Sequence, residues 1–289
     1  MGEDAKILRR RQFLQWAGGL SAALLVVGCG DGADEFVFSN ANNPQAPAPD
    51  PLGRLIARGA IEALDDGRLV ELRPRLVSVY GAGGNLLFTS TDAVLPAAAV
   101  SDAGGRIFVL DRGAGRVLVL GAAGGLENTF AESLHGIVDL ALTNGEVFLL
   151  HPVRQAIDVF STEGVFARTF TVGPERAHLR AIADSPNGDI YVLRSNPVSV
   201  IVISPQGQEL RTFAPPDGVA RNASGLAVNA AGRSAIVDHV GQQVLLFNQN
   251  NQFVAAVTIP DGNGNIAQPL AVGYGPDGQL HASYAEVIN

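Results

Sequence analysis

The sequence predicts an all-β fold, a six-bladed β-propeller, and three observations carry that prediction. First, the chain repeats in units of about 43 residues, each with a turn glycine before an apolar run; the turn glycines are Gly67, Gly105, Gly145, Gly188, Gly232 and Gly278. Second, β-branched and aliphatic runs alternate with Gly, Asn, Asp and Pro, as strands alternate with turns. Third, four such runs per unit are typical of a propeller blade.

The four runs of a unit are expected to follow one another from the centre of the propeller outward. A small apolar run such as Gly225–Val228 precedes the turn glycine, and Gly105–Asp111 illustrates the second run. Arg116–Leu120 illustrates the third run, and Val165–Phe170 the fourth. The pattern resembles the NHL repeat over most of residues 55–289. That resemblance implies a propeller but not an activity, because one fold hosts many functions.

The last unit has only two strands before the sequence ends at Asn289. Residues 35–43 (EFVFSNANN) read like Val244–Asn251, a third strand with its turn. We therefore predict that residues 35–50 close the sixth blade against the C-terminal strands, so that no sheet edge is left exposed. The proline-rich part, residues 44–50, would be the outermost strand, where proline is tolerated. The alternative is that residues 30–54 form only a tether.

The N-terminal residues predict export and lipid anchoring. Arg10 and Arg11, followed by Phe13 and Leu14, resemble a twin-arginine (Tat) signal, and the next apolar run is too short to span a bilayer. Leu25–Cys29 resembles a bacterial lipobox, which implies cleavage before Cys29 and acylation of that residue. An ordinary secretory signal with a chance cysteine is the alternative.

The expected domain organisation follows from these features. It consists of a signal peptide at 1–28, a lipidated cysteine and tether at 29–34, and the propeller at 35–289. The protein would then be anchored to a bacterial membrane and face the periplasm or the cell exterior, with the outer membrane expected in a Gram-negative host.

Composition excludes several classes of protein. The chain has 289 residues with 20 Lys+Arg and 28 Asp+Glu, and residues 29–289 hold 16 and 26 of them, a net charge of −10. A nucleic-acid partner is not expected, because there is no positive excess to neutralise phosphates. One cysteine excludes an internal disulfide, and 47% hydrophobic residues do not fit a disordered chain.

Candidate binding residues follow from the geometry of propellers, in which two sets of loops meet at one mouth of the central tunnel. One set follows the second strand of each unit and the other leads into the innermost strand. Convergent polar side chains at a concave mouth predict a ligand site. The predicted ligand-binding residues are His135, Asp139, His151, His178, Arg180, Arg194, Asn222, Asp238 and Tyr284. Asp111 is instead expected to brace its own loop with Arg116.

The expected function is a monomeric binding module for a protein, a peptide or a small molecule, with no cofactor. The alternative is a metal-dependent hydrolase or lyase, with zinc held by His135, His151 and His178 or with calcium at the mouth. Zinc-dependent amidating lyases are similar in fold but not in histidine pattern. A calcium-dependent lactonase would need a Glu at the mouth beside Asn222 and Asp238, and Glu62 is expected on the innermost strand itself.

Overall fold

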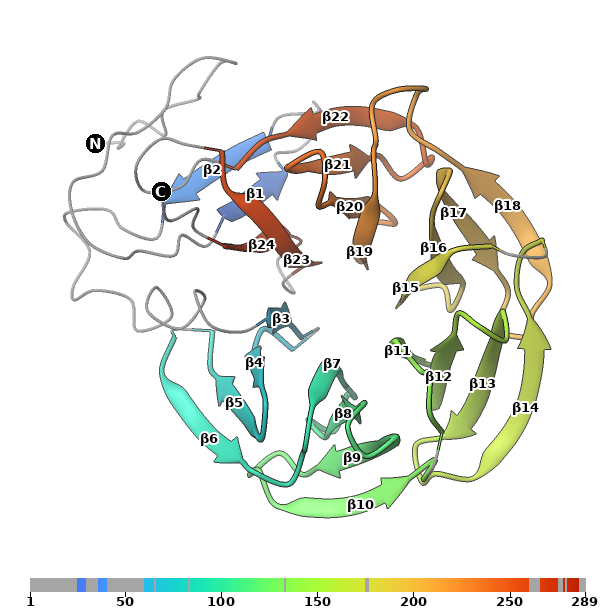
Figure 1. Cartoon of the computed structure of the whole chain (residues 1–289). Helices are drawn as coiled ribbons and strands as arrows, with labels where there is room; N and C mark the ends of the chain where they lie inside the picture. Colours follow the sequence, from blue (N-terminus) through green and yellow to red (C-terminus); the bar gives the residue numbers. More distant parts are fainter. Residues whose placement is uncertain are drawn as a thin grey trace.

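The computed structural model describes residues 25–29, 36–40, 60–64, 66–82, 84–132, 134–174, 177–259, 266–274, 278 and 280–285. Every helix or strand assigned within them is a β-strand, and these strands surround a central axis (Figure 1). No helix in the described residues is long and apolar enough to cross a membrane. The predicted all-β propeller is confirmed, but the structure shows five blades of consecutive strands and not the predicted six.

Five blades are each built from four consecutive antiparallel strands. The first contains β3 (Ala60–Ala63), β4 (Leu69–Arg73), β5 (Leu76–Tyr80) and β6 (Leu86–Ser90). The second contains β7 (Pro96–Ser101), β8 (Ile107–Asp111), β9 (Arg116–Leu120) and β10 (Leu126–Phe130). The third contains β11 (Asp139–Thr143), β12 (Glu146–His151), β13 (Ala156–Ser161) and β14 (Phe166–Thr171).

The fourth and fifth blades repeat the same order. The fourth contains β15 (Leu179–Asp184), β16 (Ile190–Ser195), β17 (Val198–Ile203) and β18 (Glu209–Phe213). The fifth contains β19 (Ala223–Val228), β20 (Ser234–Asp238), β21 (Gln243–Phe247) and β22 (Phe253–Val257). In every blade the first strand lies nearest the axis (Figure 1).

A further four-stranded sheet joins the two ends of the chain, and we call it the composite sheet. Its order is β2 (Phe36–Asn40), β1 (Leu25–Cys29), β24 (Leu280–Ala285) and β23 (Gln268–Tyr274). The strand beside β24 is therefore β1, and the segment predicted for that place, which contains β2, is one strand further out. Residues 44–50, predicted as the outermost strand, lie outside the described residues. β1 also extends back into the segment predicted as signal peptide.

Stacking of the blades explains the burial of each strand. The second and third strands pack against neighbours on both faces, so β8 is buried along its whole length, whereas the outer strand β10 is largely accessible. Each apolar cluster lies between two sheets. One joins Val70 and Val79 to Ile107 and Leu118, and another joins the fifth blade to the composite sheet through Val237 and Leu280. Both faces of these sheets are covered, which favours continuous apolar strands over alternating ones.

One repeated contact explains the glycine of the turn between the third and fourth strands. Gly124, Gly164 and Gly207 have φ between +84° and +92°, and a Cβ added to any of them would lie 2.4–2.5 Å from a phenylalanine of the preceding blade. Those phenylalanines are Phe88, Phe130 and Phe170. Glycine is required there by both the backbone conformation and the close approach.

Candidate functional site

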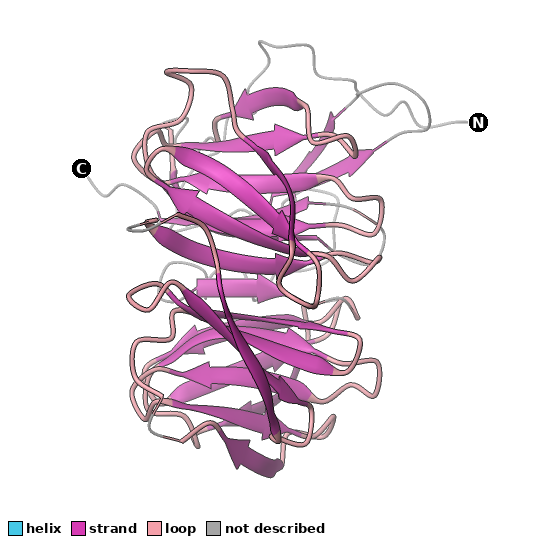
Figure 2. Cartoon of the chain, turned by 90° about the vertical axis from the view of Figure 1, so that its right-hand side faces the viewer, coloured by secondary structure: helices cyan, strands magenta, loops and turns pink. Residues whose placement is uncertain are grey.

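The loops that follow each second strand and the loops that follow each outer strand share one face of the disc, which we call the mouth face. Figure 2 shows the disc edge-on, with strands running between two faces of loops. Backbone hydrogen bonds join the two loop sets: Leu134 N donates to Gly115 O, Ser195 N to His178 O, and His239 N to Asn222 O. This pairing fixes the loops around the opening of the tunnel.

A cavity of about 260 Å³ occupies the centre of the propeller. It is lined by residues from all six innermost strands, β3, β7, β11, β15, β19 and β23. β-Bulges recur at the mouth end of these strands, where Ala97, Arg180, Ser224 and Leu270 are the extra residues. All four line the cavity, so the bulges direct side chains into its rim.

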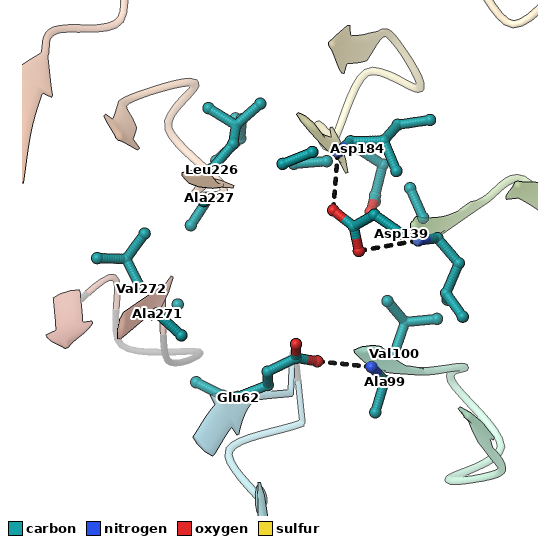
Figure 3. Close-up of a pocket in the computed structure, with 18 of the residues that line it drawn as sticks. Glu62, Ala99, Val100, Asp139, Asp184, Leu226, Ala227, Ala271 and Val272 are labelled. Atoms are coloured by element: carbon teal, nitrogen blue, oxygen red, sulfur yellow. Dashed lines mark hydrogen bonds between the residues drawn. The ribbon is translucent and has the colours of Figure 1, made fainter. Parts of the chain in front are cut away.

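Deeper in the cavity, two carboxyl groups each accept a hydrogen bond from the neighbouring blade. Ala99 N donates to Glu62 Oε2 at 2.5 Å, and Ile182 N donates to Asp139 Oδ2 at 2.9 Å (Figure 3). Asp139 Oδ1 also accepts from Leu140 N at 2.9 Å. Innermost strands are sheet edges with unpaired N–H groups, and such groups need acceptors.

The two carboxyl groups lie at the same height in the tunnel. Ala99 and Ile182 are equivalent residues of their blades, since each follows the residue that pairs with the leucine five positions after the turn glycine, Leu110 or Leu193. Along its strand, Glu62 lies further from the mouth face than Asp139 does, because Glu62 pairs with Val70 whereas Asp139 pairs with Leu150, a later residue of the second strand. The longer Glu side chain makes up the difference.

Small residues occupy the corresponding positions of the other blades. At the level of Asp139 they are Ala60, Ala98, Ala181, Gly225 and Ala271. At the level of Glu62 they are Val100, Ala141, Ala183, Ala227 and Gly273. Each ring therefore holds a single carboxyl group among small side chains, which is why a cavity remains there.

Burial has the largest effect on the pKa values of these two carboxyl groups. Burial, together with the charge of Asp139, raises the pKa of Glu62 to about 8, against the hydrogen bond from Ala99. Burial raises the pKa of Asp139 to about 7, against the hydrogen bonds from Ile182 and Leu140. Both groups consequently exchange protons near neutral pH.

Of the predicted ligand-binding residues whose side chains the structure describes, only Asp139 and Arg180 line this cavity. Arg180 is exposed at the rim and its Nε donates to Ser195 Oγ at 3.3 Å. His135 and His178 are exposed on loops of the mouth face, and His135 lies against Gly115. Asn222 is exposed there as well, and the Tyr284 side chain lies outside the described part of the chain.

Three predicted residues turn back into their own blades instead of lining the cavity. Asp238 is fully buried and accepts hydrogen bonds from Arg221 N, Asn222 N, Gly241 N and Gln243 Nε2. His151 is buried with Nε2 3.0 Å from Asp158 Oδ2, and burial lowers its pKa despite that carboxylate. Arg194 Nε donates to Ser199 Oγ at 2.9 Å. The end of the second strand therefore braces its loop.

Asp111 has the bracing role expected for it. Its carboxylate accepts from Val94 N and Leu95 N, and Arg116 Nε lies 3.4 Å from Oδ2. The histidines of the alternative zinc set are not brought together. His151 is buried beside Asp158, whereas His135 and His178 are exposed on loops. Within the described residues, no three His, Cys, Asp or Glu side chains are grouped so as to hold a metal ion.

The sequence predicts Glu62 on the innermost strand, but the predicted ligand-binding residues do not include it. The signal that could have found it is a carboxyl residue at an innermost-strand position where the other units carry small apolar residues. Asp139 shows the same signal on the innermost strand of the third blade. A comparison of the six units at these positions, rather than at the loop ends, identifies the pair.

The fold and the cavity define a β-propeller with a central pocket. No family model and no curated protein matches the chain. Among solved structures, a streptogramin B lyase is 14% identical with a TM-score of 0.60, covering 83% of this chain and 92% of that one. Selenomethionine-substituted virginiamycin B lyase from Staphylococcus aureus is 13% identical with a TM-score of 0.63, covering 95% and 98%.

A third structure is a catalytically inactive variant of the Staphylococcus aureus virginiamycin B lyase with quinupristin. It is 11% identical with a TM-score of 0.61 and covers 94% of this chain and 98% of that one. At these identities the likeness shows the fold alone.

Proposed function

We propose that the protein is a monomeric propeller that binds a small molecule in its central pocket. The observation that carries this proposal is the pair of carboxyl groups, Glu62 and Asp139, enclosed in a cavity that all six innermost strands line. An enclosed pocket with a few convergent polar groups is the usual form of a ligand site. The proposal also covers a protein or a peptide that binds at the mouth face.

The test is a thermal-shift screen with a mixed library of amines, carboxylates, sugars and neutral compounds. We expect at least one class to raise the Tm of the wild type, since a ligand that binds only the folded state stabilises it. Ser224→Trp places an indole at the rim of the cavity and is expected to remove that shift. Glu132→Gln, at an exposed position, is the control. Equal shifts in Ser224→Trp and wild type would place binding outside the pocket and contradict the proposal.

A second candidate is a lyase, which one observation favours. Two carboxyl groups whose pKa values lie at about 7 and about 8 suit general acid–base chemistry at neutral pH, because one can accept a proton while the other donates one. In such an elimination, Asp139 would remove a C–H proton and protonated Glu62 would protonate the leaving group. The lyases of the same fold make streptogramins the first substrates to test.

The lyase candidate predicts that the wild type consumes quinupristin at pH 7 and that Asp139→Asn does not. The substitution keeps a side-chain oxygen as acceptor for the backbone of β15 but removes the base. Mass spectrometry of the product measures the outcome. Quinupristin that persists with the wild type, or is consumed equally by the variant, would reject this role for Asp139.

We further propose that this protein, whose repeats resemble the NHL repeat, is exported by the Tat route. It would then be anchored through Cys29 to a bacterial membrane. The support is the run of Arg10, Arg11, Phe13 and Leu14 and the lipobox-like residues before Cys29. Cleavage there would remove four of the five residues of β1. We propose that β2 then pairs with β24 directly, with residues 44–50 outside it, so that the composite sheet serves as the sixth blade of the mature protein.

Expression in a bacterial host tests this proposal. The mature chain is expected to begin at an acylated Cys29, to fractionate with membranes and to melt as cooperatively as the full chain, because β2 replaces β1. Cys29→Ser is expected to abolish acylation, and Arg10→Lys with Arg11→Lys to abolish export. A chain that keeps residues 25–28 on its N-terminus after export would overturn the proposed cleavage.

A further inference from the structure

The carboxyl pair has no positive partner within the described part of the pocket. Arg180 is held at the rim by Ser195 and does not contact either group. The only lysine of the chain is Lys6, far outside the propeller in sequence. Both side chains are half-buried, and a carboxylate that has lost part of its water and has no positive partner is costly to ionise. Binding a proton or a cationic ligand would lower that cost.

One oxygen of the pair is available for a ligand. Glu62 Oε2 accepts from Ala99 N, and among the described residues no hydrogen bond reaches Glu62 Oε1. In Figure 3 the carboxyl groups of Glu62 and Asp139 both extend from their strands into the open centre. Each oxygen of Asp139 accepts one backbone hydrogen bond and keeps a second lone pair. The centre of the pocket thus presents acceptors from two sides.

We propose that the pocket recognises the ammonium group of a small primary amine, held between Glu62 and Asp139. This inference rests on the proposed ligand-binding function and names its ligand class. An ammonium group brings one positive charge and three donors, which match the acceptors on the two carboxylates. A divalent metal would need six or more oxygen ligands, and the described residues offer no third acidic or histidine side chain grouped with these two.

The rim suits the carbon chain of such a ligand. Ala97, Val138 and Leu270 line the cavity toward the mouth, and Leu270 is 36% exposed. The mouth face carries further exposed apolar residues in its loops, among them Val94, Leu95, Val153, Val240 and Ile266. A small ligand with its ammonium group at the carboxyl pair would place its apolar part against Ala97, Val138 and Leu270.

Binding is coupled to proton release. The ionisable residues that line the cavity are Glu62, Asp139, Asp184, Arg180 and Tyr274. With pKa values of about 8 and about 7, Glu62 and Asp139 carry protons at pH 6, and an ammonium ion must displace them. The apparent affinity for an amine that stays charged is therefore expected to rise with pH, up to about tenfold per pH unit for each proton released.

Isothermal titration calorimetry with n-butylammonium chloride tests the proposal. We expect the wild type to bind it at least tenfold more tightly at pH 8 than at pH 6, and n-butanol to bind at least tenfold more weakly. Glu62→Gln and Asp139→Asn are each expected to weaken binding at pH 8 at least tenfold. Glu132→Gln, an exposed Glu→Gln control, is expected to bind as the wild type does.

The outcomes separate this inference from the proposed function. If n-butanol or another neutral compound binds as well as the amine, and Ser224→Trp blocks both, the pocket is a ligand site but the amine inference is wrong. Binding of n-butylammonium that Glu62→Gln and Asp139→Asn leave unchanged would also overturn it. Failure of every compound to bind the wild type would overturn both proposals. Tighter binding of calcium or zinc chloride than of the amine, lost in the same variants, would replace the amine by a metal ion.

Discussion

The double variant Glu62→Gln with Asp139→Asn is expected to be more stable than the unliganded wild type at pH 8, and this difference is expected to shrink as the pH falls to 5. Both folded-state pKa values are raised, from 4.5 to about 8 and from 3.8 to about 7. As the pH rises, the unfolded chain therefore loses these two protons before the folded chain does. The free energy of unfolding of the wild type is highest below the unfolded pKa values and falls until the pH reaches the folded ones.

The expected difference at pH 8 is on the order of 3 kcal/mol, since one pKa unit corresponds to about 1.4 kcal/mol and solvent in the tunnel reduces the full effect. Urea unfolding of both proteins at pH 5, 6, 7 and 8 measures it. Both amides keep an oxygen to accept from Ala99 N or Ile182 N, so the contacts to the neighbouring blades survive. The hydrogen bond from Leu140 N to the second oxygen of Asp139 is lost in Asn, and this loss reduces the expected gain. Parallel stability curves for the two proteins would contradict the claim that these carboxyl groups are costly to ionise.

Asp238→Ala is expected to destabilise the propeller by about 3–5 kcal/mol, because it removes the acceptor of three backbone N–H groups and of Gln243 in a fully buried site. Burial opposes ionisation of Asp238, but hydrogen bonds led by that from Asn222 outweigh it and lower the pKa. The carboxylate is thus charged and satisfied in the fold at neutral pH.

Urea unfolding at pH 7 measures this effect as well. The exposed Asp217→Ala is the matched control, and it is expected to change the free energy of unfolding by less than about 0.5 kcal/mol. A loss below about 1 kcal/mol in Asp238→Ala would show that the loop does not depend on the carboxylate and would reopen a ligand role for it.

Much of the fold could be predicted because its pattern is local and repeated. Turn glycines such as Gly105 and Gly145, together with apolar runs between them, locate the four strands of a blade without reference to long-range contacts. The composite sheet could not be assigned in the same way. Leu25–Val27 suits the apolar part of a signal peptide and a β-strand equally well, and nothing in the local pattern predicts that it pairs with β24.

The site was harder to predict because position in a repeat does not give the direction of a side chain. Asp238 and His151 occupy equivalent strand ends, but hydrogen bonds and Asp158 hold them inside their blades. Glu62 and Asp139 act across a blade boundary, on Ala99 and Ile182, and contacts of that kind depend on how far each blade is rotated against the next. Asp139 was found as a neighbour of the mouth, and Glu62 needed the stacked blades to be recognised.

The most direct test of the central claim is a crystal structure of the protein with n-butylammonium at pH 8. We expect density for the amine in the central cavity, with its nitrogen about 2.8–3.0 Å from Glu62 Oε1 and from an oxygen of Asp139, the distance of charge-assisted hydrogen bonds. Its carbon chain should lie toward Leu270. An amine bound only on the outer strands, or a saturated crystal whose cavity holds water alone between the two carboxyl groups, would contradict it.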